Sequence, residues 1–264
     1  MLVYRVWTSR YLFWKVLMKF AQAMIFMFGA SFVVDASVIT FVTPSGSTVG
    51  GQPVDATVTF TTTDTSVSIA LTNLEANPTS VVQNLSDLEF TFSQDVFPSA
   101  VGGSDSAQEV TVHSDGTITL GNTVSTGWGL SAPNHHAVLL NVLDTPTGPA
   151  HTIIGPPGPG NVYSNANGAI AGNGPHNPFL NQTADFTITF PLPLLKGVTV
   201  TSATFSFGTT AGNDVNGVPA TTVPEPSFSG AVALGLGIVL IAVGRRGKPA
   251  LPVLAIVPAQ TRRS

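Results

Sequence analysis

The chain contains no cysteine, and charged residues make up only 9% of its 264 residues. Without cysteine there is no disulfide, no thiolate nucleophile and no cysteine-bound metal. This absence does not decide the cellular compartment, because many exported domains are large enough to fold without disulfides. The compartment therefore has to be inferred from the two ends of the chain.

Basic residues are almost missing from the middle of the chain. Between Ser37 and Thr222 the chain has twelve acidic residues and one basic residue, Lys196, which gives a net charge of −11. A domain this acidic repels phosphate backbones, which argues against nucleic acid as a partner. The same charge can attract divalent cations or basic partners, or simply keep an exported protein soluble.

Sequence motifs of common enzymes are missing as well. There is no Gly-x-Ser-x-Gly nucleophile elbow, no phosphate-binding loop and no dinucleotide fingerprint. Asp87 and Glu89 share a strand face and could in principle serve glycoside hydrolysis, but they fit a solvated face better. The chain is predicted not to be an enzyme and to need no cofactor.

The N-terminal region has the pattern of a signal peptide. An apolar run over residues 20–34 follows the cations Arg5, Arg10, Lys15 and Lys19. Val34 and Ala36 are the small residues at −3 and −1 that suit signal peptidase, so residues 1–36 are predicted to be removed after Ala36. An uncleaved anchor is the alternative. Met18 could itself begin a compact signal peptide, which would make residues 1–17 an upstream extension.

The C-terminal region contains an uncharged apolar stretch over residues 228–244, followed by Arg245, Arg246 and Lys248. This stretch is slightly shorter than the about 20 residues that cross a bilayer comfortably, but local thinning of the bilayer can accommodate it. The positive-inside rule keeps the basic clusters at both ends in the cytoplasm and places residues 37–222 outside it. A buried core helix is the alternative.

Directly before this stretch lies Val223-Pro224-Glu225-Pro226. The two prolines hold the segment extended and prevent the following helix from continuing through it. Ser227 or Ser229 can cap that helix, and Glu225 offers a carboxylate for recognition at the membrane surface.

The order of these parts, a Pro-Glu-Pro segment, an apolar helix and a basic cluster, resembles the PEP-CTERM sorting signal of Gram-negative bacteria. The resemblance covers residues 223–248 together with the export signal. It implies that an exosortase, a multispanning membrane enzyme, recognises Pro224-Glu225-Pro226 and processes the chain nearby. The pattern departs from the family's at residues 249–264, which continue beyond the basic cluster and are predicted to form a cytoplasmic tail.

The resemblance also implies a destination and a role. The precursor would reside in the inner membrane, and the processed protein would reach the cell surface or the extracellular matrix. Such proteins typically accompany exopolysaccharide in biofilm, so we expect a structural surface or matrix protein. The alternative is a secreted module that binds or modifies a polysaccharide.

Residues 37–222 show the alternation typical of half-buried antiparallel strands. Many short strands without an amphipathic helix predict a mainly β fold, a β-sandwich with a jelly roll or barrel as alternatives, flanked by the two terminal helices. Turns are predicted at Ser45-Gly46, Asp115-Gly116 and Asn216-Gly217. The alternating apolar residues are Val58, Phe60, Val67, Ile69, Leu71, Leu88, Phe90, Phe92, Val110, Val112, Ile118, Leu120, Phe186, Ile188, Phe190, Val198, Val200, Phe205 and Phe207.

Residues 127–180 lose the alternation and are rich in Gly, Pro and Asn, so loops are expected there. This region includes four histidines, which with Asp144 suggest a metal site, although their spacing matches no zinc motif: His135, His136, His151 and His176. Calcium is a further hypothesis, at Ser104-Asp105-Ser106 and Asn213-Asp214-Val215-Asn216-Gly217. Trp128 is expected to be a core anchor or, if exposed, a platform for a sugar ring.

Overall fold

The structure is a computed structural model that describes residues 36–96, 102–166, 170, 176–190 and 197–220. The predicted apolar run before Ala36 and the predicted sorting and membrane segments after Ala220 lie outside these residues. Within the described part of the chain, no helix is long and apolar enough to cross a membrane.

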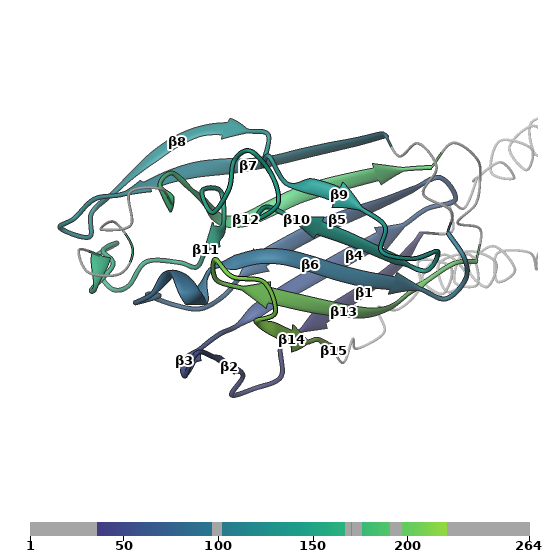
Figure 1. The fold of residues 1–264 in the computed structure, drawn as a ribbon, viewed down its shortest axis with the longest axis horizontal. Helices are drawn as coiled ribbons and strands as arrows, with labels where there is room; N and C mark the ends of the chain where they lie inside the picture. Colours follow the sequence, from purple (N-terminus) through teal and green to yellow (C-terminus); the bar gives the residue numbers. More distant parts are fainter. Residues whose placement is uncertain (1–35, 97–101, 167–169, 171–175, 191–196, 221–264) are drawn as a thin grey trace, which may run out of the picture. The chain divides into compact units, whose positions relative to one another are not determined.

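The described residues form a mainly β structure, as the sequence predicts (Figure 1). Thirteen strands belong to one sheet, whose ladders are antiparallel except for the pairing of β11 with β12, and β2 and β3 form a separate hairpin. A short 3₁₀ helix, η1, spans Val81–Gln83. The strands are β1 (Ser37–Val42), β2 (Thr48–Val49), β3 (Gln52–Pro53), β4 (Ala56–Thr62), β5 (Ser66–Asn73), β6 (Leu85–Phe92), β7 (Gly102–Val112), β8 (Ile118–Val124), β9 (Gly129–Ser131), β10 (Ala137–Asn141), β11 (Ile153–Ile154), β12 (Phe179–Thr189), β13 (Val200–Phe207), β14 (Asp214–Asn216) and β15 (Val218–Pro219).

Alternation along the strands correctly predicts the core. On β4, β5 and β6 the apolar positions are buried and the positions between them are mostly half-buried, because successive side chains of a strand point to opposite faces. Phe60 of β4 packs on Phe90 of β6 with ring centroids 4.8 Å apart, although these strands are not neighbours in the sheet. Two parts of the sheet therefore face each other across a shared core.

The strands at the two ends of the sheet order, β14 and β15, follow each other directly in the chain. Its order is β14-β13-β6-β11-β12-β5-β4-β1-β15, and only Gly217 separates β14 from β15. The N–H of Gly217 donates to the carbonyl of Ala203 on β13 at 2.8 Å, after which β15 pairs with β1. The prediction of a turn at Asn216-Gly217 is wrong. Asn216 ends β14, which pairs with β13, and Gly217 links it directly to β15, which pairs with β1.

Two further expectations need correction. Residues 127–180 contain β9, β10 and β11 as well as loops. Their pattern was not visible because β9 and β11 are very short and β10 carries consecutive apolar residues. Leu120, predicted to face the core, has 53% of its surface exposed, because β8 is an outer strand that pairs only with β7 among the described residues.

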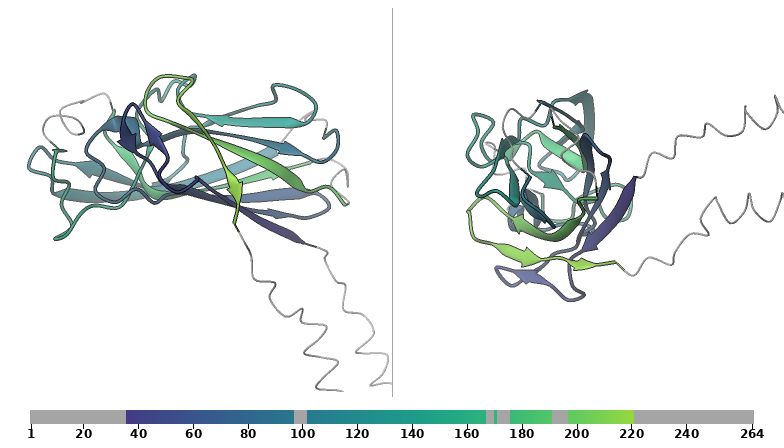
Figure 2. Two further views of the ribbon diagram at one scale, coloured as in Figure 1. Left: turned by 90° about the horizontal axis from the view of Figure 1, so that it is seen from below. Right: turned by 90° about the vertical axis from the view of Figure 1, so that its right-hand side faces the viewer.

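The first and last strands lie side by side. The N–H of Ala220 donates to the carbonyl of Thr40 at 2.8 Å, and β1 and β15 are antiparallel. The start of β1 and the end of β15 therefore leave the domain at the same end, which both views in Figure 2 show.

Candidate functional site

The residues predicted to direct sorting are almost all outside the described part of the chain. These are Val34 before the predicted cleavage point, the Val223-Pro224-Glu225-Pro226 segment, and the basic residues Arg245, Arg246 and Lys248. Ala36 is described and is exposed, and β1 begins at the next residue, Ser37.

The described residues contain no lysine or arginine, so within the described part of the chain the carboxylates find their partners among hydroxyls, amides and histidines. The ion pairs found among them both involve histidine: His136 Nε2 lies 2.7 Å from Asp95 Oδ1, and His151 Nε2 lies 3.1 Å from Glu109 Oε1. The first pair is well exposed, whereas the second is mostly buried.

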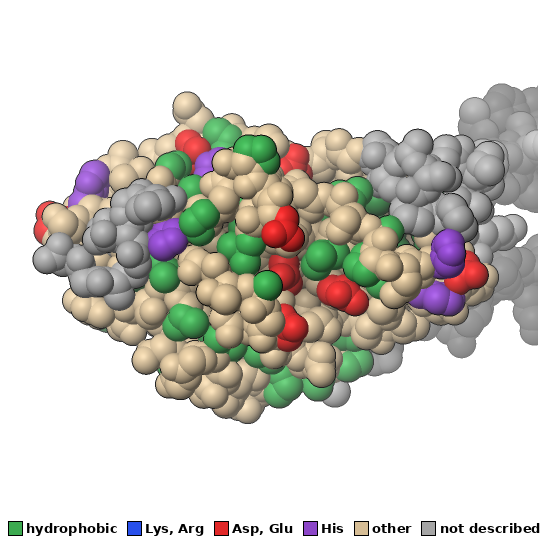
Figure 3. All heavy atoms as spheres, in the orientation of Figure 1, with side chains coloured by type: hydrophobic (Ala, Val, Ile, Leu, Met, Phe, Trp, Pro, Cys, Tyr) green, Lys and Arg blue, Asp and Glu red, His purple; other side chains and the backbone are tan. Residues whose placement is uncertain are grey.

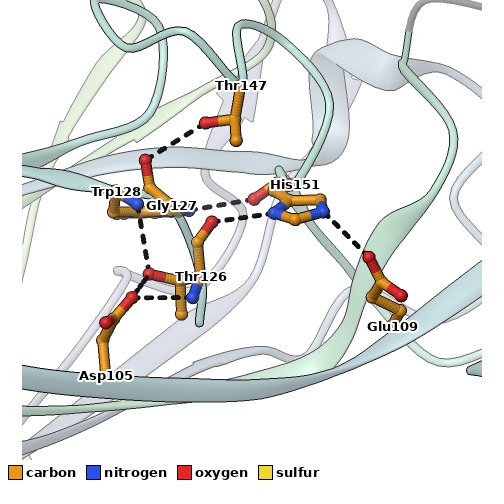
Figure 4. Close-up of polar contacts among 7 residues, drawn as sticks. All are labelled: Asp105, Glu109, Thr126, Gly127, Trp128, Thr147 and His151. Atoms are coloured by element: carbon orange, nitrogen blue, oxygen red, sulfur yellow. Dashed lines mark hydrogen bonds and ion pairs between the residues drawn. The ribbon is translucent and has the colours of Figure 1, made fainter. Parts of the chain in front are cut away.

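Asp105 and Glu109 of β7 anchor a polar cluster where the chain crosses from β8 to β9 (Figure 4). Asp105 accepts hydrogen bonds from the N–H of Thr126 at 2.7 Å, from the hydroxyl of Ser125 at 3.0 Å and from the hydroxyl of Thr126. Thr126 is fully buried. Each oxygen of the Asp105 carboxylate is therefore used to hold the crossing segment, residues 125–128, against β7.

His151 ties a second loop to the same segment. Its Nδ1 lies 2.9 Å from the carbonyl oxygen of Thr126, and its Nε2 faces Glu109. Each ring nitrogen of His151 therefore faces an oxygen that accepts hydrogen bonds. The carbonyl of His151 in turn accepts from the indole N–H of Trp128 at 2.9 Å.

Trp128 acts as a core anchor rather than an open sugar platform. It is partly buried, packs against the main core and lies on Phe186 of β12 with ring centroids 5.5 Å apart. Of the two interpretations offered by the sequence, the structure supports the first.

The hydroxyl groups of this cluster are used in its internal hydrogen bonds. The single hydroxyl proton of Thr126 goes to Asp105, and the same oxygen accepts from the N–H of Trp128 at 3.2 Å. The ring of His151 contacts the carbonyl of Thr126, not its hydroxyl. The cluster therefore fastens two loops to β7.

A second group of carboxylates lies on the outer face of β6, β13 and β14, the face toward the viewer in Figure 3. Asp87 stands opposite Ser206 of β13 and Asn141 of β10, and the hydroxyl of Ser206 also donates to Asp214. Burial, followed by repulsion from Asp214, Glu89 and Asp144, raises the pKa of Asp87 to about 6, although a hydrogen bond from Ser206 opposes the rise.

The outer face of β4, β5 and β12 has a different chemistry. The row of Thr59 continues with Ala70 and Asp185, and the row of Thr61 continues with Ser68 and Thr187. Six threonines lie on this face, and we call them the threonine face: Thr57, Thr59, Thr61, Thr72, Thr183 and Thr187. In one row Thr57 stands opposite Thr72, which stands opposite Thr183. The hydroxyls of Thr72 and Thr183 are hydrogen-bonded at 3.0 Å, and Thr59 is bonded to Thr40 of β1 at 2.9 Å.

The predicted metal ligands do not come together. His136 and His151 have separate carboxylate partners, and Asp144 accepts a hydrogen bond from Asn141 at 2.8 Å. His176 Nδ1 is buried without a partner, and burial lowers the pKa of His176. Within the described residues no group of three or more His, Asp or Glu is placed to hold a metal ion.

The carboxylates of the calcium hypothesis are also engaged. Asp105 is bonded to residues 125 and 126, and Asp214 is bonded to Ser206. Alternation correctly predicts that Asp87 and Glu89 share one face of β6, but no local signal pairs Asp105 with Thr126 or Glu109 with His151.

Comparisons with protein-family models, with curated proteins and with solved structures find no match to this chain.

Proposed function

We propose that the chain is an exported structural protein of the cell surface or extracellular matrix, associated with exopolysaccharide in biofilm. The observation that carries this proposal is the order of Val223-Pro224-Glu225-Pro226, the apolar residues 228–244 and the cluster Arg245, Arg246 and Lys248. In this proposal the segment is a PEP-CTERM signal, and an exosortase is the enzyme that acts on it. Residues 37–222 are the exported domain.

The arrangement of the domain's ends supports this proposal. Ala220 is bonded to Thr40, three residues from Ser37, so the two ends are about 10 Å apart at 3.4 Å per strand residue. A precursor with a membrane segment before Ser37 and another after Thr222 needs both attachment points on one side of the domain. The adjacency of β1 and β15 meets that need without unfolding either strand.

We assign the domain to the β-sandwich class. Strands β7, β12, β5, β4 and β1 would form one layer, and β9, β10, β6 and β13 the other. The contact of Phe60 with Phe90 and that of Phe92 with Phe190, at 6.3 Å, support two layers around one core. A domain of this kind can reach a stable core without disulfides.

The alternative is a module that modifies a polysaccharide, and one observation favours it. Asp87 has a raised pKa and carboxylate neighbours, a combination that can supply a proton near neutral pH. In that case Asp87→Asn would abolish turnover of a polysaccharide, whereas the structural role predicts no turnover by the wild-type chain.

The sorting proposal is tested by following the precursor in a Gram-negative host that expresses an exosortase. The wild-type chain should be shortened at its C-terminus and reach the cell surface, and replacing Glu225 and Pro226 by Ala should leave it uncleaved in the inner membrane. Replacing Ser227 alone by Ala is the matched control and should preserve processing. An uncleaved wild-type chain in a host that processes another substrate would refute the proposal.

A further inference from the structure

We propose that β15 is a latch on the sorting segment, and that the exosortase acts on chains in which β15 has separated from β1. The inference rests on the sorting role proposed above and deepens it. It makes the rate of processing depend on one short strand pairing at the C-terminal end of the described domain.

The latch is small. β15 has two residues, Val218 and Pro219, and both are exposed. Among the described strands β15 pairs with β1, in a register that opposes Val42 to Val218 and Phe41 to Pro219. Pro219 has no N–H to donate to this pairing. Separation of β15 therefore breaks few hydrogen bonds and gives up little burial of its own side chains, which is typical of the local openings that a folded domain makes readily.

The paired strand ends very close to the sorting segment in the chain. The N–H of Ala220 donates to the carbonyl of Thr40 at 2.8 Å, and Val223 is the third residue after Ala220. Three residues span at most about 10 Å, at about 3.4 Å per residue. A domain of this size has a radius of gyration of about 16 Å, which is larger than that reach. While β15 is paired, the domain therefore crowds any enzyme that binds Val223-Pro224-Glu225-Pro226.

Separation of β15 lengthens the reach. The next anchor toward the N-terminus is Gly217, whose N–H donates to the carbonyl of Ala203 on β13 at 2.8 Å. From Gly217 to Val223 there are six residues, which span about 20 Å when extended. Recognition of a peptide as an extended strand needs free backbone on both sides of the recognised residues. The open form provides this on the N-terminal side of the sorting segment.

Attachment and processing make opposite demands on β15. Pairing of β15 with β1 brings the two ends of the domain together, which suits a precursor with a membrane segment at each end. Processing requires the same pair to open. When opening and closing are fast relative to cleavage, the population of open chains sets the rate of cleavage.

The test locks the latch with a disulfide. The chain has no cysteine, so Val42→Cys with Val218→Cys introduces one possible bond, and directly opposed residues of antiparallel strands lie within the distance that a disulfide spans. The bacterial periplasm allows this bond to form. In a Gram-negative host that expresses an exosortase, pulse-chase labelling of the full chain should show C-terminal shortening of the locked variant at least about tenfold slower than that of the wild type.

Three controls separate locking from damage. Val42→Cys alone and Val218→Cys alone cannot form the bond and should be processed like the wild type. A reductant should restore processing of the locked variant. A flexible Gly/Ser insertion of about ten residues between Ala220 and Thr221 should also restore it, because the insertion supplies the reach without opening β15. Processing of the locked variant at the wild-type rate, or a locked variant that the insertion does not rescue, would overturn the latch.

Hydrogen exchange tests the opening without any enzyme. In the full wild-type chain, purified in detergent, the amide of Ala220 should exchange at least about a hundredfold faster than that of Phe60 on β4, which is paired on both sides. Equal protection of the two amides would overturn the proposal.

Failure of the sorting proposal has a different signature. In that case no chain is shortened, the insertion variant included, in a host that processes another substrate, and the latch is refuted as well. Rapid processing of the locked variant refutes the latch alone and leaves the sorting proposal supported.

Discussion

At the scale of single residues, the described carboxylates are compensated by described groups other than lysine and arginine. Asp105 is held by a backbone N–H and two hydroxyls, Glu109 by His151, and Asp95 by His136. Asp87 is the least compensated, since burial and three neighbouring carboxylates outweigh its bond to Ser206. Two predictions follow for single residues, one for Asp87 and one for the pair Glu109 and His151.

The first concerns Asp87. Burial raises the pKa of Asp87 from its ordinary 3.8 to about 6, so the folded state binds this proton more tightly than the unfolded state. The associated stabilisation is complete below the ordinary pKa and is lost as pH rises through about 6. Asp87→Asn should therefore raise the melting temperature at about pH 8 and give little gain at about pH 4.

The control for this prediction is Asp115→Asn. Hydrogen bonds from Thr117 lower the pKa of Asp115, so its contribution has the opposite sign and its removal should not stabilise the protein at high pH. The melting temperature of each variant is measured across the pH range. A gain for Asp87→Asn that does not vary with pH would contradict the raised pKa of Asp87.

The second concerns the pair Glu109 and His151. The side chains are 27% and 14% exposed, so their contact should be worth more than that of a surface ion pair. A double-mutant cycle with alanine at each position should give a coupling energy of about 0.5–2 kcal/mol in denaturant unfolding. The exposed pair Asp95 and His136 serves as the control and should couple by less than about 0.5 kcal/mol. Equal coupling in both pairs would show that burial does not strengthen the contact.

At the scale of elements, the closing of the sheet depends on the stretch from β14 to β15. A side chain on Gly217 would bring its Cβ to 2.9 Å from Phe205 Cε2 and 3.0 Å from the Ala203 carbonyl. This close approach is what lets one stretch pair first with β13 and then with β1.

Gly217→Ala should therefore destabilise the fold by about 1–3 kcal/mol, because the stretch must move away from β13 or distort. Denaturant unfolding of the full chain measures the change. Val218→Ala, at the next and 44% exposed position, is the control and should cost less than about 0.5 kcal/mol. A Gly217→Ala variant as stable as the wild type would mean that the closing contact contributes nothing.

Sequence pattern predicts some elements much better than others. Alternation identified β4, β5, β6 and the second half of β12, because each of these has one face on the core; the first half of β12 contains a register shift between Leu180 and Ala184 and begins in the region that was predicted to be loops. It missed β9 and β11, because they are too short for a period to show. It wrongly predicted that Leu120 faces the core, because β8 alternates like a core strand but has no layer packed over it. Asn216-Gly217 has the composition of a hairpin turn, and only its partners on β13 and β1 make it a crossing.

At the scale of the whole molecule, one sign of charge dominates. Residues 37–222 carry twelve acidic residues and one lysine, and self-repulsion of this kind weakens a compact state. Salt screens the repulsion, since the Debye length falls from about 30 Å at 0.01 M to about 8 Å at 0.15 M.

The melting temperature should therefore rise when sodium chloride is increased over this range at neutral pH. The rise should shrink at about pH 4, where many of the carboxylates become protonated. Thermal unfolding at both pH values provides the measurement and its control. A melting temperature that falls with salt at neutral pH would show that attractive pairs such as Glu109 with His151 outweigh the repulsion.

The sequence by itself determined the β content, most of the core and the acidic middle, because these depend on the order of residue types along the chain. The tertiary structure decided how β14 and β15 close the sheet, which residues hold Asp105 and Glu109, and that Thr57, Thr72 and Thr183 stand in one row across three strands. These features depend on residues that meet from distant strands, and the meeting is set by register and layer packing, which no local pattern encodes.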